Sequence, residues 1–259
     1  MRKESGMKID LTGKVGLVTG ASGELGRVIA RTLGECGADV AVHYGRNADK
    51  AESAAARVRE FGVRAMTVQA DITAGESVMA MRDAVVGELG EVDIVCANAV
   101  IQYDWKSILE QDVADFEGQF RSCSLQLVLL AKAFAPTMIA RGWGRFVVTN
   151  TECALQCLPG QGAYASAKRG LDGVVRVLAR EIGPHGITVN QVAPGWMISD
   201  KYRESGGQRQ PEYEKNVPLR HRGEDVDIAN AAAFFASDLA RFITAAYLPV
   251  CGGNVIPGL

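Results

Sequence analysis

The chain has 259 residues, of which 47 % are hydrophobic and 22 % charged, and its formal net charge is −2. The composition is typical of a globular protein, and the length suits one large α/β domain or two small ones. A nearly neutral chain has no basic field to attract nucleic acid or anionic lipid, and no apolar run approaches the roughly 18 residues of a membrane span. We therefore expect neither nucleic acid nor a membrane among its partners.

Short β-branched runs alternate with longer helical patterns along the chain. The runs that predict strands are 15–19, 39–44, 64–70, 92–97, 145–151, 187–193 and 246–250. The patterns that predict helices are 24–36, 47–61, 74–89, 113–140, 161–182 and 225–237. This alternation predicts an α/β fold in which helices cover both faces of a parallel sheet, and right-handed crossovers make the sheet doubly wound. Without repeats or linkers, we expect a single domain over residues 11–259.

Residues 198–216 break this alternation, because they are polar, carry many charges and contain Gly206 and Gly207 in sequence. A connection longer than about 12 residues inside a compact domain is usually functional or disordered. This one follows a predicted strand end, where ligands bind in such sheets. We interpret it as a mobile flap over a substrate site, with Trp196 and Tyr202 as candidate substrate contacts.

Six cysteines are spread along the chain, mostly within apolar runs. This distribution is typical of reduced, buried thiols in a cytoplasmic protein. Cys153 and Cys157 lack the usual spacing of a zinc knuckle, and the histidines are distant in sequence, so we expect no metal site. Residues 1–10 include basic side chains with no hydrophobic stretch after them, which favours a flexible tail over a secretory signal.

The first predicted strand runs into the glycine-rich turn TGASGELG, from Thr19 to Gly26, which opens a helix. Glycines let the backbone approach a pyrophosphate, and a helix N-terminus offers unpaired N–H groups and a positive dipole end. A glycine loop between the first strand and first helix of a repeating β-α pattern indicates a dinucleotide. The contacts that we expect from this loop are Gly20, Ser22, Gly23 and Leu25.

Tyr164 and Lys168 stand four residues apart at the start of a predicted helix. Residues at i and i+4 share a helix face, so the phenol and the ammonium should point into the same space. A nearby cation lowers the pKa of a phenol, which would make Tyr164 a proton donor and acceptor near neutral pH. Such a pair also occurs by chance, so its value as evidence depends on the glycine loop upstream.

These motifs together resemble the classical short-chain dehydrogenase/reductase family over roughly Leu11 to Gly253. The resemblance implies a Rossmann fold and hydride transfer between a nicotinamide cofactor and a carbonyl or secondary alcohol. The family's loop is Thr-Gly-x-x-x-Gly-x-Gly, whereas this chain has Glu24 at the middle glycine. A carboxylate there would repel a pyrophosphate, so we expect Glu24 to turn outward and Gly23 to supply the close approach.

The end of the second predicted strand bears on the choice of cofactor. An acid at this point suits NAD, and a nearby arginine suits the 2′-phosphate of NADP. Tyr44 and Gly45 occupy the acidic positions and Arg46 follows, so we predict NADP(H) over NAD(H). The other cofactor contacts implied by the resemblance are Asp71, Ile72, Asn98, Tyr164, Lys168, Pro194, Gly195, Met197 and Ser199.

The family places a serine thirteen residues before the tyrosine, and Thr151 stands there in this chain. Its hydroxyl can still donate to a substrate oxygen. The resemblance makes Tyr164 the general acid and base, Thr151 the stabiliser of the oxygen, and Lys168 the residue that lowers the Tyr164 pKa and holds the ribose. Cys123 takes the place of a fourth residue, an asparagine. Because a thiol is a weak hydrogen-bond former, we expect an altered or solvent-fed proton relay.

The segments near the C-terminus resemble those of 3-oxoacyl carrier-protein reductases and of sugar or polyol dehydrogenases, and the family implies a homotetramer. The leading hypothesis is an NADP(H)-dependent carbonyl reductase or alcohol dehydrogenase acting on a small molecule. The departures at Glu24, Cys123 and Cys251 keep open a non-catalytic dinucleotide-binding sensor. An epimerase or dehydratase that uses transient oxidation at the same site is a third reading.

Overall fold

The computed structural model describes residues 8–207 and 209–258, and its framework is a seven-stranded sheet in the order β3-β2-β1-β4-β5-β6-β7. All neighbouring strands pair in parallel. The strands are β1 (Val15–Val18), β2 (Asp39–Tyr44), β3 (Ala65–Gln69), β4 (Ile94–Ala97), β5 (Gly144–Thr149), β6 (Ile187–Pro194) and β7 (Tyr247–Val250). The direction of winding reverses between β1 and β4, and ligands bind at such a switch point.

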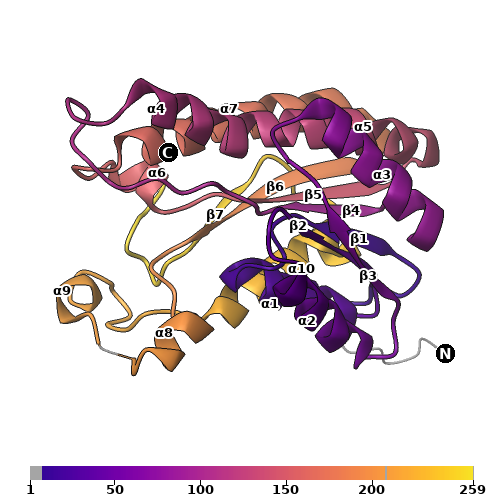
Figure 1. Cartoon of the computed structure of the whole chain (residues 1–259), viewed down its shortest axis with the longest axis horizontal. Helices are drawn as coiled ribbons and strands as arrows, with labels where there is room; N and C mark the ends of the chain where they lie inside the picture. Colours follow the sequence, from indigo (N-terminus) through magenta and orange to yellow (C-terminus); the bar gives the residue numbers. More distant parts are fainter. Residues whose placement is uncertain (1–7, 208, 259) are drawn as a thin grey trace.

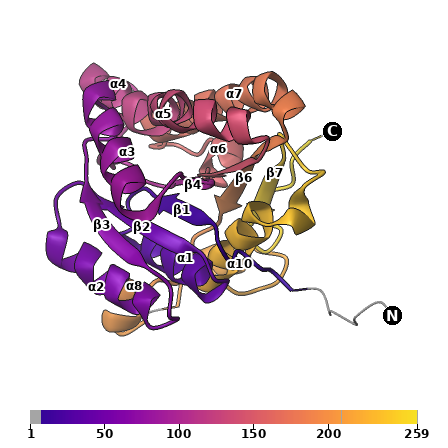
Figure 2. The ribbon, with the colours of Figure 1, turned by 90° about the vertical axis from the view of Figure 1, so that its right-hand side faces the viewer.

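Helices cover both faces of the sheet, as Figures 1 and 2 show, with α3, α4, α5 and α7 on one face and α1, α2 and α10 on the other. The single-domain, doubly wound architecture predicted from the sequence is thus confirmed. The helices are α1 (Glu24–Glu35), α2 (Ala48–Arg59), α3 (Gly75–Leu89), α4 (Val113–Phe120), α5 (Gln126–Arg141), α6 (Cys153–Gln156), α7 (Gly162–Ile182), α8 (Asp200–Glu204), α9 (Pro211–Glu214) and α10 (Asp225–Ala236).

Successive side chains of each strand point to opposite faces of the sheet and pack in two hydrophobic cores, one under each helical layer. In β1, Leu17 packs into the core beneath α5 and α7, whereas Val18 packs into the core beneath α1, α2 and α10. In β4, Val95 and Ile94 divide in the same way. Because both faces of the sheet are buried, the strands appear in the sequence as continuous apolar runs, which explains why their positions could be predicted.

The long helix predicted over 113–140 is interrupted. Between α4 and α5 the chain makes a π-helical turn, η1 (Arg121–Leu125), which contains Cys123. A π turn inserts extra backbone into a helix and is frequent at functional sites. The apolar periodicity on either side predicts a helix but carries no signal for the wider turn, so the interruption was missed.

This helical stretch also corrects the expectation that nothing in the chain resembles a membrane span. Val113–Arg141 is long and apolar enough to cross a membrane, with a mean hydropathy of 1.5 in its most apolar window. However, 56 % of that window is buried within the fold. Leu127, Leu130 and Phe134 of α5 lie in the core against the sheet, and this burial accounts for the apolar composition.

The segment 198–216, predicted to be an irregular flap, contains two short helices, α8 and α9. In Figure 1, α9 lies at the lower left, away from both helical layers, whereas α8 lies beside the layer that contains α1 and α10. Residue 208, within the flap, is outside the described residues. So are residues 1–7, which make up most of the predicted tail, while Leu11 is already buried and its N–H donates to the carbonyl of Cys36.

His43 of β2 fastens the glycine loop to the sheet. Its ring is 1 % exposed, Nδ1 accepts from the N–H of Gly20 at 2.9 Å, and Nε2 lies 3.1 Å from the carbonyl oxygen of Ala70. A carbonyl only accepts, so Nε2 carries the proton and the imidazole is neutral. Burial lowers the pKa of His43, because the charged ring would lose its hydration. One neutral side chain thus joins the glycine loop to the ends of two strands.

We expect the free energy of unfolding to fall as the pH drops below about 6.5, because the unfolded chain then binds a proton that the buried imidazole does not. The slope should reach up to about 1.4 kcal/mol per pH unit. In His43→Asn an amide oxygen and an NH2 group can replace the two ring nitrogens, so this part of the slope should vanish. Urea unfolding of both proteins at pH 7.5 and 5.5 measures the difference. Identical slopes would refute the role of His43.

Candidate active site

A cavity of about 1140 Å³ opens at the carboxyl ends of the strands, around the switch point between β1 and β4. Its size is ample for a dinucleotide or a cofactor together with a small substrate. Most of the residues predicted from the sequence meet in its lining: Gly20, Ser22, Gly23, Leu25, Arg46, Asp71, Ile72, Asn98, Thr151, Tyr164, Lys168, Pro194 and Gly195.

The glycine loop is folded so tightly that side chains at two of its glycines would collide with the chain itself. Gly20 has φ +65°, and a Cβ there would lie 2.9 Å from the Cα of Ala99. At Gly26 a Cβ would lie only 2.3 Å from the carbonyl oxygen of Gly20. Gly23 caps α1 without a side-chain hydrogen bond from the described residues, which leaves the first N–H groups of the helix for an anion. The loop therefore fits a pyrophosphate.

Glu24, at the position of the missing glycine, borders this cavity. Its Oε2 lies 2.9 Å from Nη2 of Arg27, one turn further along α1. The same Nη2 lies 2.9 Å from Oδ2 of Asp200 in α8. Glu24 thus has a cationic partner, but Arg27 divides its single charge between two carboxylates, so the repulsion expected between Glu24 and a pyrophosphate is reduced only in part.

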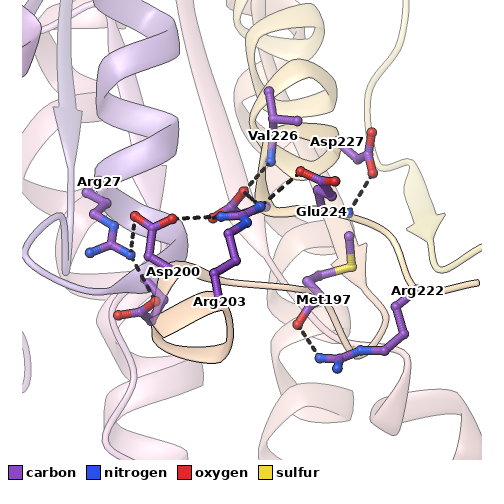
Figure 3. A network of polar contacts seen from close by, with 10 residues as sticks. Arg27, Met197, Asp200, Arg203, Arg222, Glu224, Val226 and Asp227 are labelled. Atoms are coloured by element: carbon purple, nitrogen blue, oxygen red, sulfur yellow. Dashed lines mark hydrogen bonds and ion pairs between the residues drawn. The ribbon is translucent and has the colours of Figure 1, made fainter. Parts of the chain in front are cut away.

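Asp200 extends this ion pair into a network that spans three helices (Figure 3). Arg203 of α8 contacts Asp200 at 2.7 Å, Glu224 at 2.9 Å and Asp225 at 3.1 Å, and the last two residues begin α10. Exposed ion pairs contribute little singly, but a shared arginine restricts several side chains at once. The network fixes the first half of the flap against α1 and α10. Its members are distant in sequence and carry no motif, so sequence analysis missed it.

The floor of the cavity is a buried polar cluster around Thr19. Its hydroxyl accepts from the N–H groups of Asn98 and Ala99 at 2.9 and 3.0 Å and donates to Oε1 of Gln126 at 2.7 Å. Asn98, a predicted cofactor contact, donates to the Thr19 carbonyl at 3.0 Å and accepts from the Thr149 hydroxyl at 3.2 Å. These bonds hold the ends of β1, β4 and β5 in register.

Thr151, Tyr164 and Lys168 converge on one end of the cavity. Nζ of Lys168 lies 5.8 Å from the centroid of the Tyr164 ring and donates to the carbonyl of Thr149 at 2.6 Å. The Tyr164 hydroxyl is hydrogen-bonded to Thr151, whose main-chain carbonyl accepts from the Tyr247 hydroxyl at 2.5 Å. Thr151 lies just beyond the end of β5 rather than within it.

The expected acidic phenol is not what this arrangement gives. Burial raises the pKa of Tyr164 above its ordinary value of 10.0, because phenolate loses its hydration, and the hydrogen bond with Thr151 only partly opposes this. Burial likewise lowers the pKa of Lys168. Sequence spacing predicted the shared face correctly but could not reveal how deeply the pair is buried. Tyr164 therefore keeps its proton near neutral pH.

Cys123 lies in the π-helical turn and is buried. The π-helical turn lies against α7, since the Ser124 hydroxyl donates to the carbonyl of Ala167 at 2.8 Å, so Cys123 belongs to a turn that packs on the helix carrying Tyr164 and Lys168. Its Sγ accepts from Nε2 of Gln119 at 3.3 Å. Gln119, one turn earlier and itself buried, therefore brings an amide to this position.

Five predicted site residues lie outside the lining formed by the described residues: Cys123, Trp196, Met197, Ser199 and Tyr202. Trp196 is 51 % exposed and packs edge-on against Tyr213, while the Tyr202 ring stacks on the guanidinium of Arg222 at 4.2 Å. Arg222 also donates to the carbonyls of Trp196 and Met197 at 2.8 and 2.7 Å.

Sequence reasoning counted Trp105 only as one of several candidate apolar contacts and missed that its ring stacks near that of Tyr164, with centroids 6.5 Å apart. It also missed Glu152, a buried acid beside Thr151. Neither residue belongs to the motif, and only the packing of loops reveals them. Within residues 8–207 and 209–258, no group of three or more His, Cys, Asp and Glu side chains gathers to hold a metal ion.

Comparisons with known proteins agree with this geometry. A family model described as "Enoyl-(Acyl carrier protein) reductase" matches residues 20–254. A 3-oxoacyl-[acyl-carrier-protein] reductase of Pseudomonas aeruginosa is 36 % identical over 245 residues, covering 95 % of this chain and 98 % of that protein. Its counterpart in Staphylococcus epidermidis is 34 % identical over 250 residues, covering 93 % and 98 %.

Among solved structures, a 7α-hydroxysteroid dehydrogenase complexed with NADH and 7-oxo glycochenodeoxycholic acid superimposes with a TM-score of 0.87 at 31 % identity, covering 96 % of each chain. An NAD+-bound xylitol dehydrogenase gives a TM-score of 0.87 at 29 % identity, covering 94 % of this chain and 99 % of that one. The chain belongs to the short-chain dehydrogenase/reductase family of NAD(P)-dependent oxidoreductases, which act on carbonyl and CH–OH groups.

Proposed function

We propose that this protein is an NADP(H)-dependent carbonyl reductase or secondary-alcohol dehydrogenase in which Tyr164 is the general acid and base. The observation that carries the proposal is the convergence of a hydroxyl, a phenol and an ammonium, from Thr151, Tyr164 and Lys168, in a cavity bordered by the glycine loop. Dinucleotide binding alone does not require all three groups. Their presence argues against the sensor reading.

When bound, the nicotinamide would supply hydride to a carbonyl carbon in reduction or accept it in oxidation. The protein's own task is to manage the charge that develops on the substrate oxygen. Tyr164, protonated near neutral pH, would donate its proton to that oxygen, and the Thr151 hydroxyl would stabilise it with a hydrogen bond. In the reverse direction Tyr164 would accept the proton. Lys168, held by the Thr149 carbonyl, would keep a positive charge beside the phenol.

The small-molecule substrate class follows from the relatives. Two curated relatives are named as 3-oxoacyl-[acyl-carrier-protein] reductases, and two solved ones as steroid and xylitol dehydrogenases. A carbonyl or secondary alcohol is the group common to these substrates. Apolar residues exposed on the helical layer, such as Val113, Phe120 and Val177, suit contacts between subunits, which supports the proposal of a cytoplasmic homotetramer.

The preference for NADP(H) is argued from this chain's own residues, since the two solved relatives hold NAD(H). Arg46 is exposed at the border of the cavity just after β2. Tyr44 and Gly45 offer no carboxylate for a ribose 2′-hydroxyl. A 2′-phosphate would gain a charge-assisted contact with Arg46. His43 and Asp71 have other tasks, because Asp71 accepts from the N–H and hydroxyl of Thr73.

Replacing Tyr164 by Phe should lower kcat at least about 100-fold, because the proton donor is lost. NADPH affinity and the melting temperature should stay close to wild type, since the ring remains. Reduction of a panel of ketones, followed at the nicotinamide absorbance, gives kcat, and NADPH fluorescence gives the affinity. Near-normal turnover in Tyr164→Phe would refute the assignment. Wild-type protein that binds NADPH but turns over no substrate would favour the sensor.

Arg46→Ala should raise the KM for NADPH about tenfold and leave the KM for NADH unchanged, because only the 2′-phosphate contacts the guanidinium. Arg57→Ala is the matched control: it removes an exposed arginine from α2, and we expect both KM values to remain as in wild type. A wild-type preference for NADH, or equal effects of Arg46→Ala on the two cofactors, would contradict the prediction.

A further inference from the structure

We propose that Tyr213, Glu152 and Asn254 form an anchor that holds the second half of the flap against the segments that follow β5, β6 and β7, which makes Tyr213 and Glu152 positioning residues for the reaction. The inference rests on the proposed function for its kinetic consequence only. The anchor itself is defined by hydrogen bonds between parts of the chain that are far apart in sequence. Tyr213 and Glu152 are 61 residues apart, and Glu152 and Asn254 are 102 apart.

The hydroxyl of Tyr213 is the centre of the anchor. It donates to Oε1 of Glu152 at 2.8 Å and accepts from the N–H of Trp196 at 2.8 Å. The other oxygen of Glu152, Oε2, accepts from Nδ2 of Asn254 at 2.9 Å. The carboxylate of Glu152 is therefore held between the flap helix α9 and the segment that follows β7.

Both residues that contact the Tyr213 hydroxyl are next to residues of the active site. Glu152 follows Thr151, and its N–H donates to the carbonyl of Pro194 at 2.9 Å. Trp196 follows Gly195, which lines the cavity and where a Cβ would lie 2.7 Å from the Tyr213 hydroxyl. A shift of α9 therefore moves the segments that follow β5 and β6, which carry the catalytic hydroxyl and part of the cofactor site.

The burial of Glu152 explains why the anchor should be specific. The residue is only 4 % exposed, and burial raises its pKa, while the hydrogen bonds from Asn254 and Tyr213 act in the opposite direction. A buried carboxylate that loses a donor is costly, because no water replaces the missing bond. Burial also raises the pKa of Tyr213, so its hydroxyl keeps the proton that it donates. Displacing the flap would leave Glu152 partly unsatisfied, which opposes the displacement.

Two variants separate this positioning role from simple stabilisation. Tyr213→Phe removes the hydroxyl and leaves the buried carboxylate without one donor. We expect the melting temperature to fall by about 2–6 °C and the substrate KM to rise about tenfold. Combining Tyr213→Phe with Glu152→Gln removes the unsatisfied charge, so most of the decrease in melting temperature should be reversed. KM should stay raised, because α9 is still detached from the N–H of Trp196.

Glu212→Gln is the matched control, since it neutralises an exposed carboxylate of the same helix that lies outside the anchor. We expect its melting temperature and KM to equal those of wild type. If the melting temperature and the KM of the double variant both return to the wild-type values, Tyr213 acts only as a partner for the buried charge and the inference is wrong. An unchanged KM in Tyr213→Phe would overturn it as well.

Limited trypsin digestion makes the anchor testable even if no carbonyl substrate is reduced. Arg203 and Arg209 are exposed in the flap, and a protease cuts a segment faster when it opens more readily from the fold, so the rate of cleavage after them reports how firmly the flap is held. We expect both Tyr213 variants to be cut several-fold faster than wild type and Glu212→Gln to be cut at the wild-type rate. Equal rates in all four proteins would refute the anchor. Absence of turnover in wild type would instead refute the proposed function and leave the digestion result standing.

Discussion

The fold and the site both depend on how the chain satisfies its backbone where the sheet reverses its winding. At this point β1 and β4 end side by side, and two N–H groups leave the sheet without a strand partner. The Thr19 hydroxyl accepts from both of them and gives its own proton to Gln126. Since a hydroxyl offers one donor and two acceptor positions, it is fully used. The amide of Gln126 donates onward to the carbonyls of Ala99 and Ser122, so the cavity floor is tied to the π-helical turn.

Burial governs the chemistry of the groups that surround this floor. His43, Tyr164 and Lys168 all lie in low-dielectric surroundings, and each shifts its pKa in the direction that favours its neutral form. The side chains thus provide a neutral imidazole, from His43, under the glycine loop and a protonated phenol, from Tyr164, at the other end of the cavity. A buried phenol that keeps its proton suits the role of general acid that we propose for Tyr164, because it has a proton to give as charge grows on a substrate oxygen.

Features fixed by local sequence were predictable, whereas those fixed by long-range packing were not. The strand β2 was predicted with its observed bounds, and the positions of Thr151, Tyr164 and Lys168 followed from spacing within one strand–helix unit. The π-helical turn was missed because its flanks share one apolar pattern. The pKa of Tyr164 was predicted in the wrong direction because spacing reports which side chains share a face and not how much water reaches them. Glu152 and Tyr213 became neighbours only through the placement of a flap whose polar sequence has no period.

Two acidic residues next to the site, Glu24 and Glu152, are each linked to the flap. Glu24 replaces a glycine and pairs with Arg27, whose guanidinium also contacts Asp200 in α8. Glu152, beside Thr151, reaches Tyr213 in α9. The two halves of the flap are thus held by different chemistry, an ion-pair network that salt screens and a buried carboxylate that it does not reach. The first contact lies beside the glycine loop and the second beside Thr151, whose hydroxyl we propose as catalytic. The placement of the flap is therefore coupled to the glycine loop and to the surroundings of Thr151, where we expect the cofactor and the substrate to bind.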